Sequence, residues 1–272
     1  MSRPIRVGAV NYLNARPLIE DLESLAPEIQ LSLEVPSKLA DQLAVAEIDV
    51  GLIPVIEYFR AGSYSVVPEV AIASRGAVLS VTLFSRKPWP RITSVALDEG
   101  SRTSATLARI LLHKRYGVRP EYVSLPLNQP AEEVSTDAVL LIGDRAMHAC
   151  LPGFTYAYDL GQEWQDWTSL PFVYAFWAVR QGVDLNGVED AFRQAKDRGL
   201  EHVGAIAQRE SARLGLDAGF CRRYLNHIIQ YDLGPREQAG LHHFYALACE
   251  LGLARRGVSI EYYRANALVE SR

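Results

Sequence analysis

A dense group of hydroxyl side chains separates a strand-like segment, residues 94–97, from a helical segment, residues 103–116. Free backbone N–H groups, hydroxyl donors and the positive end of a helix together form an anion site without any net positive charge. A hydroxyl here could instead cap the helix. The arginine in this group, Arg102, could bind a carboxylate or lie in solvent. Three hydroxyls in four positions exceed what capping requires, so we expect an anion to bind here. The residues are Ser101, Arg102, Thr103 and Ser104.

Two asparagines follow the first strand-like segment, residues 5–10, where the chain turns into a helical pattern. Asn11 and Asn14 could each cap that helix. Alternatively, one of the two amides points across a cleft to an oxygen of the ligand. The residue types favour a polar, uncharged wall at this strand end.

A third strand end combines a glycine with a carboxylate. Residues 138–142 are a continuous apolar run, which is typical of a strand covered on both faces, and Gly143 and Asp144 end it. Asp144 could cap the following helix, accept hydrogen bonds from a hydroxylated ligand, or transfer a proton. Ser80 interrupts another strand-like segment, residues 78–84, and either bonds to the backbone or faces the same ligand.

The elements that must position these residues alternate between strand and helix. This alternation predicts an α/β fold with mixed, mostly parallel sheets and helices on both faces. The last third of the chain, from Leu185 onward, has a helical pattern. Strands are expected at residues 5–10, 31–35, 48–53, 78–84, 94–97, 122–125, 138–142 and 172–179, and helices at 13–25, 36–47, 103–116, 188–199, 201–214, 218–230 and 235–253.

The segment Pro88-Trp89-Pro90 has the composition of a linker. It divides a first lobe, residues 1–87 plus 178–272, from an inserted second lobe, residues 91–174. Two chain crossings, near residues 85–90 and 175–180, then form a hinge. Ligands in such sheets bind beyond the carboxyl ends of the strands, so the site is expected in the cleft between the lobes.

Composition excludes several classes of protein. The 272 residues carry a formal net charge of -4, which gives no general attraction for nucleic acid or anionic lipid. No apolar run approaches the roughly 20 residues of a membrane helix, and the apolar run at residues 7–10 is too short for a signal peptide. We therefore expect a cytoplasmic protein. The three cysteines have neither metal-ligand nor disulfide-framework spacing, and the common nucleotide, zinc and hydrolase motifs are absent.

The segment Asn11-Tyr12-Leu13-Asn14-Ala15-Arg16-Pro17-Leu18 resembles the opening of the chorismate dehydratases of the futalosine route to menaquinone, the menaquinone biosynthesis protein A family. Single motifs are weak, but their ordered set, spread over about residues 5–180, is specific. The further matching segments are residues 47–53, 101–104, 141–144, 159–164 and 170–178.

The resemblance implies a two-lobed, type II periplasmic-binding-protein-like fold with an interdomain cleft. It also implies that water is eliminated from chorismate to give 3-[(1-carboxyvinyl)oxy]benzoate without a cofactor. The composition and motifs described above lead us to expect no metal, nucleic acid or membrane partner. Asn14 and Asp144 are then the expected catalytic residues. The other expected site residues bind substrate: Asn11, Ser80, Ser101, Arg102, Thr103, Ser104 and Gly143.

The sequence leaves the proton-abstracting base open among Asp144, a group oriented by Asn14, and a carboxylate of the substrate itself. It also leaves the oligomeric state open. The alternative functions are a non-catalytic receptor for a small anion and the effector domain of a regulator. A third is an enzyme like dihydroxynaphthoate synthase, which carries a Cys-Pro-Asn-Asp type sequence at the first turn and a histidine where this chain has Gly143-Asp144.

Overall fold

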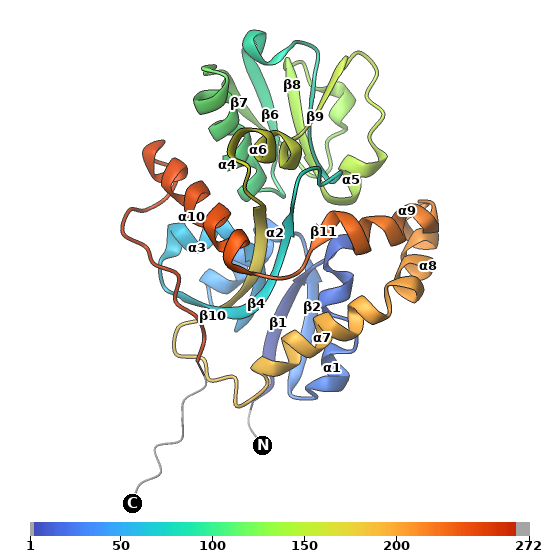
Figure 1. Cartoon of the computed structure of the whole chain (residues 1–272), viewed down its shortest axis with the longest axis vertical. Helices are drawn as coiled ribbons and strands as arrows, with labels where there is room; N and C mark the ends of the chain where they lie inside the picture. Colours follow the sequence, from blue (N-terminus) through green and yellow to red (C-terminus); the bar gives the residue numbers. More distant parts are fainter. Residues whose placement is uncertain (1–2, 265–272) are drawn as a thin grey trace, which may run out of the picture.

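The computed structural model describes residues 3–264 and arranges them in two lobes, each built around one β-sheet (Figure 1). Lobe 1, in the lower half of Figure 1, contains the six-stranded sheet and the C-terminal helices. Lobe 2, in the upper half, contains the five-stranded sheet. The parts of the predicted first lobe at residues 1–2 and 265–272 lie outside the described residues.

The sheet of lobe 1 has the order β11-β4-β10-β3-β1-β2. Here β1 pairs in parallel with β2 and β3, whereas β10 runs antiparallel to β3 and β4. Every residue of β10 except the last is buried, as its apolar run requires. The bounds are β1 Ile5–Val10, β2 Ile29–Glu34, β3 Val50–Pro54, β4 Tyr64–Ser74, β10 Phe172–Arg180 and β11 Ile229–Gln230.

The sheet of lobe 2 has the order β7-β6-β8-β5-β9. Here β6 pairs in parallel with β7 and β8, and β5 runs antiparallel to β8 and β9. Both sheets are therefore mixed. They contain fewer parallel strand pairs than expected, because β5 and β10 each enter their sheet directly from the other lobe and run antiparallel to their neighbours. The bounds are β5 Val81–Ser85, β6 Ser94–Asp98, β7 Glu121–Leu125, β8 Ala138–Ile142 and β9 Tyr156–Asp159.

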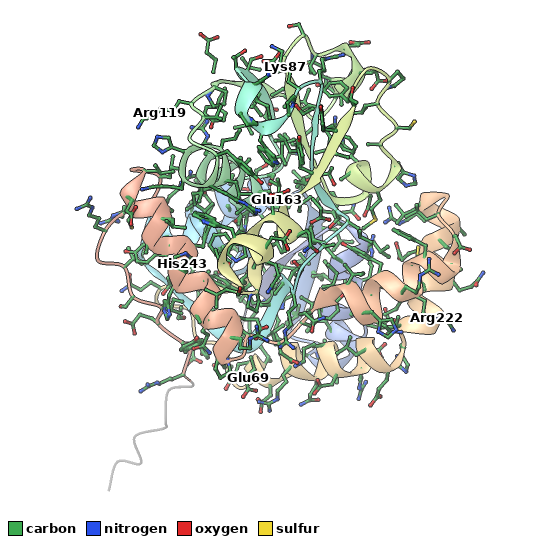
Figure 2. The ribbon with its side chains drawn as sticks, turned by 45° about the horizontal axis from the view of Figure 1, so that its top comes forward. Glu69, Lys87, Arg119, Glu163, Arg222 and His243 are labelled. Atoms are coloured by element: carbon green, nitrogen blue, oxygen red, sulfur yellow. The ribbon has the colours of Figure 1, made fainter. Side chains whose placement is uncertain are left out.

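Helices cover the faces of both sheets, and charged side chains such as Lys87 and Arg222 lie on the outside (Figure 2). No helix within residues 3–264 is long and apolar enough to cross a membrane. In lobe 1 the helices are η1 Leu13–Leu18, α1 Leu22–Leu25, α2 Pro36–Ala44, α3 Val55–Ala61, α7 Glu189–Glu201, α8 Val203–Leu214, α9 Ala218–Arg223, η5 Tyr224–Ile228 and α10 Pro235–Glu250. In lobe 2 they are η2 Trp89–Arg91, α4 Thr103–Ile110, η3 Leu111–Arg115, η4 Ala131–Glu133, α5 Gly143–His148 and α6 Leu160–Thr168.

The chain changes sheets earlier than the prolines suggested. It leaves β4 at Ser74 and enters β5 at Val81, whereas Pro88-Trp89-Pro90 lies inside lobe 2 and contributes to η2. The turn between the strands is held by Asp159, whose carboxylate accepts hydrogen bonds from the backbone N–H groups of Val78, at 3.0 Å, and Leu79, at 2.7 Å. The return crossing, at residues 169–171, also precedes its expected position.

The predicted helix at residues 13–25 is broken into η1 and α1. Pro17 lies inside η1, which is a 3₁₀ helix, and Asp21 has a φ of 58° before α1 begins. Proline lacks the N–H group that a continuing α-helix needs at this point. The short η1 helix keeps Asn14 beside the end of β1.

Candidate active site

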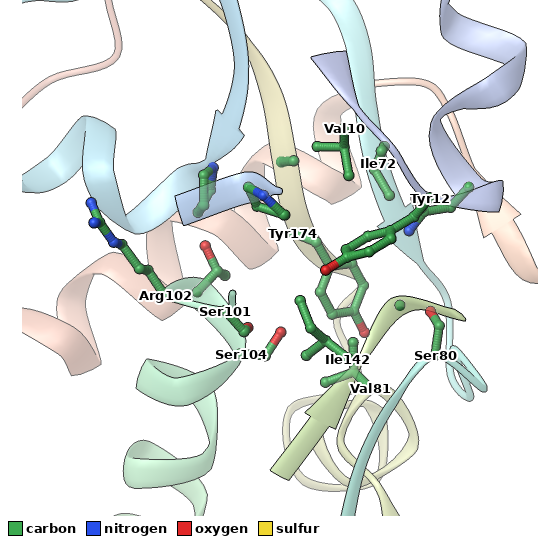
Figure 3. A pocket seen from close by; sticks show the side chains of 16 residues that line it. Val10, Tyr12, Ile72, Ser80, Val81, Ser101, Arg102, Ser104, Ile142 and Tyr174 are labelled. Atoms are coloured by element: carbon green, nitrogen blue, oxygen red, sulfur yellow. The ribbon is translucent and has the colours of Figure 1, made fainter. Parts of the chain in front are cut away.

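A cavity lies between the lobes. Its walls come from the carboxyl ends of β1, β3 and β8, the starts of α2, α4 and β5, and the middle of β10 (Figure 3). Seven of the nine expected site residues line it, and Asn11 and Asp144 do not. The seven are Asn14, Ser80, Ser101, Arg102, Thr103, Ser104 and Gly143.

The start of α4 presents hydrogen-bond donors to the cavity. Its first backbone hydrogen bond runs from Thr106 N–H to the Arg102 carbonyl, at 3.1 Å, so the preceding N–H groups have no partner within the helix. The side chains of Ser101 and Ser104 are buried at this helix start, beside the cavity (Figure 3). We call Ser101, Ser104 and these N–H groups the donor wall. It suits a carboxylate, because it offers several donors without a free positive charge.

Arg102 and Thr103 contact the opposite lobe. The Arg102 guanidinium pairs with Asp41 of α2 at 2.8 Å and with Glu57 of α3 at 3.1 Å. The Thr103 hydroxyl accepts a hydrogen bond from Ile56 N–H at 3.3 Å. The positive charge of Arg102 is therefore already neutralised by two carboxylates of lobe 1.

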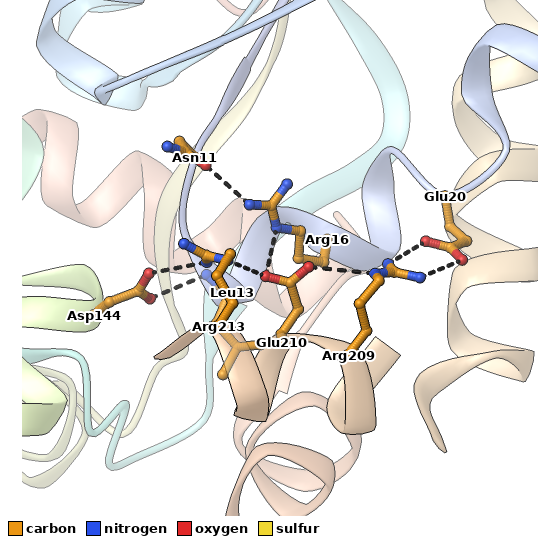
Figure 4. A network of polar contacts seen from close by, with 8 residues as sticks. All are labelled: Asn11, Leu13, Arg16, Glu20, Asp144, Arg209, Glu210 and Arg213. Atoms are coloured by element: carbon orange, nitrogen blue, oxygen red, sulfur yellow. Dashed lines mark hydrogen bonds and ion pairs between the residues drawn. The ribbon is translucent and has the colours of Figure 1, made fainter. Parts of the chain in front are cut away.

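Asp144 forms a second contact between the lobes. One carboxylate oxygen accepts a hydrogen bond from Leu13 N–H at 3.1 Å, and the other lies 3.6 Å from Arg213 (Figure 4). Burial raises the pKa of Asp144, against the opposing effects of the Leu13 N–H group and of the Arg213 charge. The carboxylate is thus turned toward η1 and α8 rather than toward the cavity.

The same network continues into lobe 1. Buried Glu210 pairs with Arg213 at 2.6 Å and with Arg16 at 3.2 Å, and Arg16 donates to the Asn11 side chain at 2.9 Å (Figure 4). Asn11 is exposed and lies on the outside of this network. Its amide supports Arg16.

Two tyrosines that the sequence analysis did not single out line the cavity. Tyr12 lies across Gly143, which has a φ of +60°, and a Cβ at residue 143 would approach the Tyr12 ring to 2.8 Å. The hydroxyl of Tyr174 lies 3.1 Å from the Ser74 hydroxyl. Burial, helped by nearby carboxylates, raises the pKa of both tyrosines, so both stay neutral donors. Tyr12 lies inside the matching motif, which was the available signal.

A third tyrosine supports the cavity from behind. Buried Tyr224 of η5 donates a hydrogen bond from its hydroxyl to the Ser80 hydroxyl at 2.8 Å. Burial raises the Tyr224 pKa, so this hydroxyl keeps the proton that it donates. The Asn14 Oδ1 atom is buried and has no partner within residues 3–264.

The cavity wall carries little charge. Among the described residues that line it, none is a carboxylate, an imidazole or a lysine, and Arg102 is the single charged side chain. Within residues 3–264, no group of three histidine, cysteine or acidic side chains could hold a metal ion. The residues present can orient a ligand and stabilise negative charge.

The sequence matches a profile of the menaquinone biosynthesis family over residues 5–250. Chorismate dehydratase of Thermus thermophilus is 31% identical over 261 residues, which cover 89% of this chain and 94% of that protein. Chorismate dehydratase of Campylobacter jejuni is 27% identical over 254 residues, which cover 91% of this chain and 99% of that protein.

Solved structures share the fold. A protein of Archaeoglobus fulgidus superposes with a TM-score of 0.75 and 20% identity, covering 93% of this chain and 99% of its own. The periplasmic aliphatic sulphonate binding protein of Escherichia coli superposes with a TM-score of 0.65 and 17% identity, covering 100% and 96%. The expected two-lobed, periplasmic-binding-protein-like fold is confirmed. The chain belongs to the menaquinone biosynthesis family, in which its curated relatives are chorismate dehydratases.

Proposed function

We propose that this protein is a chorismate dehydratase, which eliminates water from chorismate to give 3-[(1-carboxyvinyl)oxy]benzoate. The observation that carries the proposal is the donor wall of a cavity between two lobes, in a chain whose relatives have this activity. Chorismate has two carboxylates and one hydroxyl. A small cavity with neutral donors, aromatic rings and an uncharged amide matches those groups.

The donor wall is proposed to hold the ring carboxylate. The C3 proton of chorismate is acidified through the ring double bond, so negative charge moves onto this carboxylate as the proton leaves. Ser101, Ser104 and the N–H groups of α4 are already in place and stabilise that charge without rearranging. Loss of the C4 hydroxyl then makes the ring aromatic, which provides much of the driving force.

The base is proposed to be a carboxylate of the substrate itself. No carboxylate, imidazole or lysine is found among the described residues that line the cavity, and the Asp144 carboxylate contacts Leu13 and Arg213. A substrate carboxylate takes the C3 proton, the C4–O bond breaks, and the same proton leaves with the hydroxide as water. Asn14 holds the substrate in the geometry that this transfer requires.

Contacts between the lobes are proposed to seal the reaction from solvent. The Arg102 pairs and the Asp144 contact lie on different edges of the cavity. Excluding water strengthens the hydrogen bonds of the donor wall and protects the dienolate from being reprotonated. We also propose that the reaction belongs to the futalosine route and takes place in the cytoplasm.

The test is to incubate the purified protein with chorismate and to follow the loss of one water by mass. Replacing Ser101 and Ser104 together by alanine should raise the KM strongly, by about 1–3 kcal/mol for each charged hydrogen bond lost. Exposed Ser32→Ala is the matched control and should behave as the unmodified protein. Binding of chorismate without any turnover would instead assign the protein as a receptor for a small anion.

A further inference from the structure

The hydrogen-bond polarity of the cavity differs between its two sides. The donor wall lies at the start of α4 in lobe 2. Across the cavity lie Asn14 of η1 and Ser80, which precedes β5. The direction of the hydrogen bonds around these two residues decides what they can still offer to a ligand.

Tyr224 fixes that direction. A tyrosine hydroxyl has one proton, and that of Tyr224 is directed to the Ser80 oxygen at 2.8 Å. The Val78 carbonyl lies 3.4 Å from the Ser80 oxygen and offers the Ser80 proton an acceptor within the same turn. With its proton directed there, the Ser80 oxygen presents a lone pair, an acceptor, to a ligand.

Asn14 completes the same arrangement. Its side chain lines the same cavity, and its Oδ1 atom is buried and has no partner within the described chain. A buried acceptor without a partner costs free energy unless a ligand satisfies it.

We propose that Asn14 Oδ1 and Ser80 Oγ form an acceptor wall that binds the C4 hydroxyl of the substrate, and that Tyr224 is the positioning residue that makes it an acceptor wall. This inference rests on the proposed function. Carboxylates carry acceptors only, so they are repelled here and bind at the donor wall. The hydroxyl is the one donor of a fully ionised chorismate, so it binds at the acceptor wall. The polarity of the two walls thereby orients the ring between them.

The test compares chorismate with the reaction product, which has both carboxylates but lacks the C4 hydroxyl. Tyr224→Phe should lower kcat/KM for chorismate about tenfold, the effect of one or two neutral hydrogen bonds. The inhibition constant of the product should stay unchanged, because the product does not use the acceptor wall. Ser80→Ala should act in the same way, and the double variant should be no worse than Ser80→Ala alone.

Tyr231→Phe is the matched control, since Tyr231 is also buried and its hydroxyl has no partner within residues 3–264. It should leave both constants unchanged. Equal weakening of chorismate turnover and product binding in Tyr224→Phe would show that Tyr224 only supports the cavity. Full activity in that variant would also overturn the proposal.

If Tyr224→Phe does not fold, the acceptor wall is tested with Ser80→Ala alone, measured with chorismate and with the product. A selective loss for chorismate then supports the acceptor wall, and an equal loss for both compounds overturns it. If the unmodified protein fails to convert chorismate at all, the proposed function itself is wrong, and that outcome is separate from these comparisons.

Discussion

The guanidinium of Arg102, at the start of α4 in lobe 2, lies 2.8 Å from both carboxylate oxygens of Asp41 on α2 of lobe 1. A second carboxylate, Glu57, lies 3.1 Å away. The residue that directly precedes α4, the helix of the proposed anion site, is therefore also a bridge between the lobes. The ion pairs that join the two lobes therefore lie directly beside the donor wall.

The first prediction concerns this bridge. Arg102→Ala should raise the KM for chorismate several-fold and change kcat less, because it removes a partly exposed ion pair that holds the lobes together. Such pairs contribute only about 0–1 kcal/mol each. Steady-state kinetics measure the effect, and small-angle scattering should show a larger molecule.

The control for this variant is Arg193→Ala, which removes ion pairs with Glu69 and Asp190 inside lobe 1. It should leave both the KM and the scattering profile unchanged. Identical dimensions and kinetics for Arg102→Ala and the unmodified protein would mean that the bridge does not hold the lobes together.

The position of a residue in the chain determines whether its place in this site can be predicted from the sequence. Asn14, Ser101 and Gly143 come within a few residues of strand ends, and the carboxyl ends of neighbouring strands meet at one edge of a sheet. Strand patterns therefore predicted these residues at the strand ends that border the cavity. The helix at residues 103–116 was predicted because its apolar spacing is regular, and the structure forms it as α4 followed by η3.

Contacts over long sequence distances could not be predicted in this way. The Tyr224 hydroxyl meets Ser80 across 144 positions, and Asp144 meets Leu13 across 131. An apolar helix pattern shows which face is buried but not which side chain it will meet. The hinge was misplaced for a related reason, since the turn at Leu79 depends on Asp159, 80 positions away.

The second prediction separates Asn14 from Asp144. Asn14→Ala should lower kcat by about a hundredfold, because a misoriented substrate loses the geometry of proton transfer. Asp144→Asn should keep turnover within about threefold, since an amide oxygen can still accept the Leu13 N–H bond.

The pH dependence of kcat distinguishes the roles of these two residues. An Asp144 base would give an acid limb that disappears in Asp144→Asn together with most of the turnover. That result would refute the assignment of a substrate carboxylate as the base. Exposed Asn128→Ala is the control for the amide substitution and should have no effect.

The third prediction concerns stability. Asp49 is buried, and it pairs with Arg3 at 2.7 Å, Arg6 at 2.9 Å and Arg180 at 3.0 Å. Burial alone would raise the Asp49 pKa, but hydrogen bonds from Arg6 and Arg180 outweigh it and hold the pKa well below its usual range. Asp49→Asn should lower the free energy of unfolding at pH 7 by about 3 kcal/mol, as loss of a buried charge partner does.

The sign of the pH effect follows from the lowered pKa. The stabilisation by Asp49 is complete above the usual aspartate pKa of about 3.9 and is lost as the pH falls toward the folded-state pKa. The difference in Tm between Asp49→Asn and the unmodified protein should therefore shrink below about pH 4. Asp190→Asn, at an exposed ion pair, should cost less than about 1 kcal/mol at any pH. A difference that persists unchanged at low pH would contradict the ion-pair explanation.

The last prediction tests whether Tyr12 must lie across Gly143. Gly143→Ala adds a Cβ that would lie 2.8 Å from the Tyr12 ring, and it also strains a backbone with a φ of +60°. The strain alone costs about 1 kcal/mol, and Gly117→Ala in the same lobe isolates it, because Gly117 has a φ of +68° and no atom within 4 Å of its added Cβ. Both variants should lose the stability that the strain costs, and Gly143→Ala should lose more because of the contact with the ring. Only Gly143→Ala should lose activity, by at least about tenfold, because the displaced ring opens the cavity between the lobes. Equal activity in the two variants would show that the packing of Tyr12 against Gly143 does not help to form the site.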